Sequence, residues 1–204
     1  MTFIENVTLD VADETVAKEF YRTAFGLTPE QLRVRAGVEA SSGFRGYALS
    51  LTVAQPANVN AFFEAAIAVG ATVLRPASKS LWGYGGVLQA PDGAIWKLAS
   101  SAKKDSGPAK REFESLVLLL GVEDVLVSKQ FYVEQGLTVG KSFGRKYVEF
   151  ASGDALVTLA LYRRTALAKE AGVAPEGSGS HRITLGGGAA AFTDPDGFAW
   201  EEAA

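Results

Sequence analysis

The chain opens with apolar and polar residues in alternation, the pattern of a strand with one buried face. Val7, Leu9 and Val11 would face the core, and the residues between them would face the opposite side. Asp13 can then start a helix, because its carboxylate accepts from free amide groups at a helix N-terminus. Gly26 can end that helix, since glycine tolerates the left-handed backbone found there.

Further periodic runs predict the other elements of the chain. A second amphipathic helix is expected after Asn58 and would be closed by Gly70. Strands are expected at residues 47–53, 72–75, 86–89, 95–99, 116–120, 146–150, 156–162 and 182–185. Two more helices are expected at residues 125–135 and 165–171, and the glycine run 186–188 is interpreted as a turn.

Two sequence patterns recur in the same order in each half of the chain. Phe-Tyr followed by Gly-Leu occupies residues 20–27 and returns at 131–137, and Pro-Asp-Gly-x-x-Trp occupies 91–96 and returns at 195–200. Between the copies lies a stretch rich in Ser, Lys, Gly and Pro. These repeats predict a first βαβββ-type module at 1–100, a linker at 101–111, and a second, shortened module at 112–204.

Composition excludes several classes of function. The 204 residues include no cysteine, so disulfides, thiolate metal sites and cysteine nucleophiles are absent from the sequence. A net charge of −3 gives no reason to expect nucleic acid or an anionic membrane as a partner. The densest aliphatic run, 116–120, is too short to cross a bilayer, and the N-terminus lacks the pattern of a signal peptide. We therefore expect a cytoplasmic protein with a small-molecule partner.

Taken together, these patterns resemble the vicinal-oxygen-chelate superfamily of glyoxalases, bleomycin-resistance proteins and dioxygenases. The resemblance rests on the opening strand, the Phe-Tyr helix, Trp-Gly-Tyr-Gly-Gly at residues 82–86, and the two Pro-Asp-Gly hairpins. It covers most of the chain. The family implies an α+β fold of tandem βαβββ modules that form curved mixed sheets, with a ligand cavity on the concave side.

Enzymes of this family commonly hold a divalent metal ion, such as Mn, Fe, Ni, Zn or Mg, with ligands from a module's opening strand and from a Glu of its last strand. In this chain the opening-strand position falls on Asn6 or Val117, and the last-strand position on Lys97 or Glu201. The sole histidine, His181, lies at the start of a strand and could join Glu201. The resemblance therefore leaves at most His181 and Glu201 as metal ligands, and we expect that no metal binds.

Strand parity and residue chemistry supply further candidates for the ligand cavity. Aromatic rings can stack on a ligand, cations can meet an anionic group, and polar residues of the opening strand would face the cavity. The ligand-binding candidates are Asn6, Thr8, Trp82, Tyr84, Lys97, Arg182 and Glu201. Glu201 is also the one candidate for a catalytic acid or base.

Three functions remain open from the sequence. The first is a metal-free binding protein that sequesters an aromatic antibiotic or metabolite. The second is a metal-dependent lyase, isomerase or dioxygenase, and the third is a degenerate paralogue with a role in assembly or regulation. Binding without catalysis is favoured. A homodimer is also expected, because the second module lacks a helix and leaves sheet surface to be covered.

Overall fold

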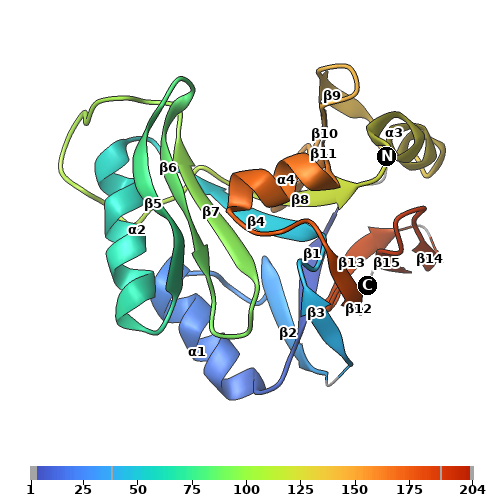
Figure 1. Ribbon diagram of the computed structural model, residues 1–204, viewed down its shortest axis with the longest axis horizontal. Coiled ribbons are helices and arrows are strands. Elements are labelled where there is room, and N and C mark those ends of the chain that lie inside the picture. Colours follow the sequence, from blue (N-terminus) through green and yellow to red (C-terminus); the bar gives the residue numbers. More distant parts are fainter. Residues whose placement is uncertain (1–3, 38, 189, 203–204) are drawn as a thin grey trace.

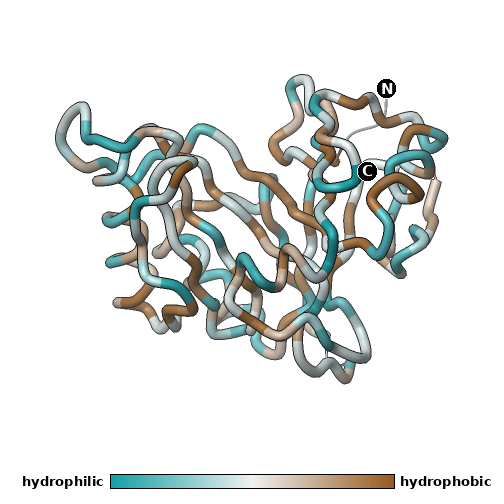
Figure 2. Tube along the Cα trace, turned by 45° about the horizontal axis from the view of Figure 1, so that its top comes forward, coloured by the Kyte–Doolittle hydropathy of each residue, from teal (hydrophilic) through white to brown (hydrophobic). Residues whose placement is uncertain are grey.

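The computed structural model describes residues 4–37, 39–188 and 190–202 and shows an α+β fold with two large curved sheets (Figure 1). No helix in the described ranges is long and apolar enough to span a membrane. The connection between the two halves of the chain, predicted as a linker, forms an outward loop that is mainly hydrophilic (Figure 2).

The first helix, α1 (Glu14–Phe25), begins and ends where its capping residues predict. The Asp13 carboxylate accepts from the backbone amides of Thr15 and Val16, and Gly26 ends the helix with a left-handed φ of 68°. In the second half, α3 (Val125–Glu134) is capped in the same way by Asp124. The other two helices are α2 (Pro56–Ala68) and α4 (Arg164–Ala171).

An eight-stranded sheet has the order β5-β6-β7-β4-β8-β11-β10-β9. Its strands are β4 (Tyr47–Thr52), β5 (Thr72–Ser80), β6 (Gly83–Gln89), β7 (Ile95–Ser100), β8 (Ser115–Val122), β9 (Val139–Ser142), β10 (Tyr147–Phe150) and β11 (Val157–Arg163). A five-stranded sheet has the order β14-β15-β13-β1-β2. Its strands are β1 (Asn6–Val11), β2 (Leu32–Ala36), β13 (Ile183–Gly188), β14 (Phe192–Thr193) and β15 (Ala199–Glu202). The short strands β3 (Ser41–Gly43) and β12 (Gly177–Gly179) pair with each other.

The chain order of these strands reveals four units, two in each half. The units β4-α2-β5-β6-β7 and β8-α3-β9-β10-β11 are complete, and in both the last strand lies beside the opening strand. The unit that begins with β1 has one helix, α1, and one parallel strand, β2, in the five-stranded sheet. The unit that begins with β13 has no helix in its described residues. The fold of tandem βαβββ modules is thus confirmed, but each half holds two units where the repeats predicted one module.

The two halves share both sheets. β4 pairs antiparallel with β8 in the larger sheet, and β1 pairs antiparallel with β13 in the smaller one. The predicted module boundaries at residues 100 and 112 stay a prediction, because strands from before and after them pair in the same sheets.

The repeated sequence patterns meet each other in the structure. The Tyr21 hydroxyl of α1 donates to the Asp92 carboxylate at 2.6 Å, and the Tyr132 hydroxyl of α3 donates to the Asp194 carboxylate at 2.7 Å. Trp96 and Trp200 are fully buried in the main core, as their alternation predicts. Each Phe-Tyr helix is therefore fastened to the hairpin at the end of its own half of the chain.

The interpretation of residues 186–188 as a turn was wrong. Gly186 and Gly188 lie in β13, where glycine serves a close approach between strands. A Cβ on Gly186 would lie 2.8 Å from both polar atoms of the Asn6 side chain. Gly186 therefore leaves room for the Asn6 side chain on the face of the sheet, and the chain continues as a strand without reversing.

Candidate functional site

The middle of the concave face of the eight-stranded sheet is covered by α4 (Figure 1). Leu167, Ala168 and Ala171 of this helix are buried in a cluster with residues from four strands of the sheet: Ala48, Val87, Val117, Leu119 and Ala160. Gly121 of β8 allows the approach, since a Cβ there would lie 3.1 Å from the Cα atom of Arg164. The helix is therefore part of the fold's packing, and two cavities lie beside it.

One of these spaces is a cavity of about 430 Å³ between α4 and the strands β5, β6 and β7. We call it the Lys97 pocket. Lys97 and Ala99 of β7 and Gly85 of β6 line it from the sheet, and Glu170 lines it from α4. The small residues on the sheet leave room for a flat molecule. The volume lies within the range of small-molecule sites.

The Lys97 pocket combines cations with an aromatic rim. The Lys97 ammonium donates to the Glu170 carboxylate, and the two side chains are 25% and 37% exposed. Arg75 also lines the pocket. Trp82 stands at the hairpin between β5 and β6 and is 85% exposed. The lining residues thus carry two positive charges and one negative charge.

Tyr84 borders the same pocket, but its side chain is directed away from it. Its hydroxyl donates to the Asn60 side chain of α2 at 2.9 Å, and its ring packs against the main core. Its predicted role as a stacking residue therefore does not fit. Which face of β6 Tyr84 would occupy could not be predicted, because Val87 and Leu88 are both apolar and both buried, on opposite faces of the strand.

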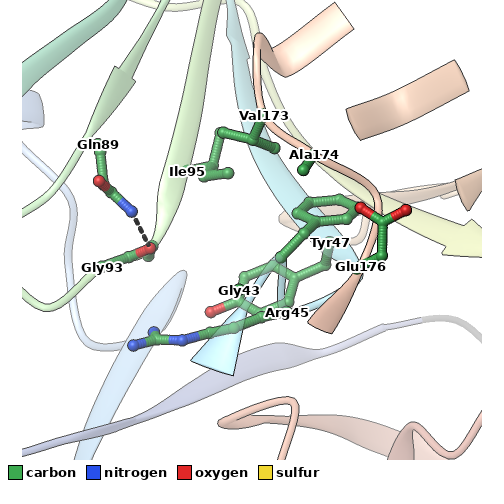
Figure 3. A pocket seen from close by; sticks show the side chains of 11 residues that line it. Gly43, Arg45, Tyr47, Gln89, Gly93, Ile95, Val173, Ala174 and Glu176 are labelled. Carbon is green, nitrogen blue, oxygen red and sulfur yellow. Dashed lines mark hydrogen bonds between the residues drawn. The ribbon is translucent and has the colours of Figure 1, made fainter. Parts of the chain in front are cut away.

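A second cavity lies beside the segment that follows the C-terminal end of α4, next to the start of β7 (Figure 3). Its volume is about 340 Å³. Arg45 donates to the carbonyl oxygen of Asp92 at 2.8 Å, and Gln89 donates to that of Gly93 at 3.2 Å. These polar groups are engaged in holding the Pro-Asp-Gly hairpin, so the cavity offers few free donors.

The five-stranded sheet carries a third hollow, of about 470 Å³, with Arg35 beside it. All three guanidinium nitrogens of Arg35 have partners. Nε donates to Asp10 at 2.9 Å, Nη1 to Glu201 at 3.0 Å and Nη2 to the Thr184 hydroxyl at 3.1 Å. The hydrogen bond with Asp10, followed by that with Glu201, raises the pKa of Arg35 above its usual value. Glu201 is therefore paired with a cation that it shares with Asp10.

His181 and Arg182 both bind backbone carbonyl groups. The ring nitrogens of His181 lie 2.6 Å from the carbonyl oxygen of Arg45 and 3.0 Å from that of Asp196, and the ring stacks on Phe198. The Arg182 guanidinium donates twice to the carbonyl oxygen of Glu39. Both ring nitrogens of His181, and the Nε and Nη2 atoms of Arg182, are thus engaged with the backbone.

Asn6 and Thr8 lie on the face of β1 opposite the core, as parity predicts, and only 7% and 9% of their surfaces are exposed. Asn6 lies over Gly186, whose strand neighbour is Glu201. Their role in ligand binding stays a prediction.

Comparison with solved structures relates this arrangement to known folds. A V278E mutant of glyoxalase I from Zea mays aligns with 99% of this chain and 92% of its own, with a TM-score of 0.63 and 16% identity. A putative dioxygenase from Bacillus subtilis aligns with 91% of this chain and 70% of its own, with a TM-score of 0.54 and 12% identity. The chain has the vicinal-oxygen-chelate fold. No protein-family model matches the sequence, and no curated protein matches it significantly.

The side chains of this vicinal-oxygen-chelate fold do not suit the metal ion that the resemblance implies. In the described ranges, no three or more His, Asp or Glu side chains gather where they could hold an ion. His181 faces carbonyl oxygens, and Glu201 pairs with Arg35. In the larger sheet, Lys97 places a cation in the last strand of its unit, at the position where the resemblance implies a carboxylate ligand.

Two residues of the Lys97 pocket were not found from the sequence. Arg75 ends the predicted strand 72–75 and Glu170 lies in the predicted helix 165–171, but nothing in the sequence indicated that either residue would lie near Lys97. No local pattern marks either residue. Only the packing of α4 on the sheet brings Glu170 to Lys97.

Proposed function

We propose that this protein binds a small organic molecule with a planar part in the Lys97 pocket, without a metal ion. The observation that carries the proposal is Lys97, which lies in β7 with its side chain on the concave face of the sheet, where a metal site would need an anion. The pocket is also the cavity in which sequence candidates for ligand binding come together, namely Trp82 and Lys97.

The residues present suggest how such a ligand would be held. A planar group would lie over Gly85 and Ala99, whose small side chains leave the sheet surface open. Trp82 stands at the rim with an exposed ring that can stack on the ligand's outer face. Lys97 and Arg75 supply charged donors for a polar substituent. The ammonium of Lys97 and the carboxylate of Glu170 are paired with each other in this arrangement, and the proposal is therefore binding without catalysis.

A ligand panel in the presence of a chelator tests this proposal. A compound that binds the folded state at 100 times its Kd adds about 2.7 kcal/mol to the free energy of unfolding. In a chain of this size, that raises Tm by roughly 5–10 °C.

Ala99→Trp would fill the pocket and remove the shift, while Ala68→Trp, at an exposed position of α2, would keep it. A panel without any shift, or a shift that survives Ala99→Trp, would overturn the proposal.

A homodimer remains part of the proposal, supported by the unit that begins with β13, which has no helix in its described residues. Light scattering after size exclusion would give the mass, and a monomer at all concentrations would refute it.

A further inference from the structure

The partner of Lys97 is a carboxylate of the same chain. Glu170 reaches the Lys97 ammonium from the last turn of α4, inside the cavity proposed to hold the ligand. An ammonium group has three donor hydrogens and is best satisfied by anions. Glu170 therefore occupies the place that an anionic group of a ligand would take.

The helix is fixed, but the glutamate on it is free to move. Leu167, Ala168 and Ala171 are buried against the sheet, whereas the Glu170 side chain is more than one-third exposed at the edge of the pocket. Rotation about its own side-chain bonds would take the carboxylate out to water without moving the helix. Such a rotation in an exposed residue is fast, and its cost is the loss of the ion pair with Lys97.

A second cation stands beside this glutamate. Gly172 ends α4 with a φ of 80°, and a Cβ there would lie 3.1 Å from the Cγ and Nε atoms of Arg75. Arg75 thus passes along the end of the helix and lines the same cavity. Once Glu170 turns away, the lining residues keep two positive charges, and an anion is then favoured over a neutral or cationic molecule.

We infer, on the basis of the proposed function, that the ligand of the Lys97 pocket carries a carboxylate, and that Glu170 is its internal competitor. The ligand carboxylate replaces that of Glu170 at the Lys97 ammonium, and the side chain of Glu170 rotates into solvent. Glu170 thereby keeps the lysine paired in the empty pocket, and a ligand must carry an anionic group to displace it.

The test compares aromatic carboxylates with their uncharged amides, using benzoate with benzamide and indole-3-acetate with indole-3-acetamide. Binding is measured by isothermal titration calorimetry at neutral pH. Glu170→Gln removes the competing charge, so the affinity for the carboxylates should rise by about tenfold, as expected for one charge-assisted hydrogen bond. Affinity for the amides should not change.

Two further variants complete the design. Lys97→Met should abolish the preference for carboxylate over amide, even if it also lowers stability, because the preference is a ratio measured within one variant. Glu134→Gln removes the same charge from the exposed face of α3 and should leave every affinity unchanged.

If the amides bind as well as the acids, or Glu170→Gln leaves the ratio unchanged, the inference fails while the proposed function stands. If neither these probes nor the wider panel bind any variant, the proposed function fails with it.

Discussion

Truncation of Leu167 to alanine should destabilise the protein strongly, because this side chain anchors α4 to the concave face of the sheet. Leu167 is only 2% exposed, and its Cδ2 atom approaches the surface of Gly121, where a Cβ would lie 3.4 Å away. Ala48 and Ala160 of the sheet lie in the same buried cluster, and such short side chains cannot extend to fill the vacated space.

The expected loss follows from the size of the buried group. Leucine-to-alanine changes in cores cost about 2–5 kcal/mol, with the larger values where the site cannot collapse. We therefore expect a loss of about 3 kcal/mol in the free energy of unfolding, measured by urea denaturation. At roughly 2–4 °C per kcal/mol, Tm should fall by roughly 6–12 °C.

The matched control is Leu126→Ala, the same substitution at a position of α3 where the leucine is 38% exposed. Its effect should stay within about 1 kcal/mol. If Leu167→Ala were no more damaging than this control, α4 would not be packed on the sheet, and the division of the concave face into separate cavities would be refuted.

Three further results are expected. Tyr132→Phe should cost about 1–3 kcal/mol in urea denaturation, because it removes the tyrosine donor to the Oδ2 atom of the buried Asp194 carboxylate. Tyr47→Phe removes a buried hydroxyl that has no partner among the described residues and should be neutral or stabilising, and equal losses for the two variants would contradict this. Burial raises the pKa of Asp194 in the folded state. The protonated carboxyl therefore contributes its full stabilisation below the unfolded-state pKa of about 4, and this stabilisation is lost as the pH rises through the folded-state pKa. Wild type should therefore lose stability relative to Asp194→Asn as pH rises above about 4, and a difference that is constant with pH would exclude the linkage. Elemental analysis of the purified protein should show no stoichiometric divalent metal; metal that disappears in both His181→Ala and Glu201→Ala would establish the metal site that the geometry disfavours.

The parts of the fold that the sequence predicts are those set by local physics. Asp13 and Gly26 mark the ends of α1 because capping and a left-handed terminus depend on a few neighbouring residues. The alternation around Val7 and Leu9 likewise places Asn6 on the face away from the core. These signals act within one element, so one sequence is enough to detect them.

The candidate site depended on contacts between distant parts of the chain. The helix α4 was predicted from its own residues, but its seat on the sheet depends on Gly121 and on small residues from other strands. Short strands such as β3 and β9 carry too few apolar residues to show a period. The role of His181 was equally hidden, because both of its partners are backbone carbonyl groups.

The sharing of both sheets between the two halves also bears on how this chain folds during synthesis. β4 can pair with β8 once residue 122 has been synthesised. β1 can pair with β13 only near the end of synthesis, because Asn6 pairs with Gly186. Closing so long a loop is slow, and until then one edge of β1 stays open to other chains. The first half should therefore aggregate when it is expressed alone and recover its fold when the second half is supplied with it.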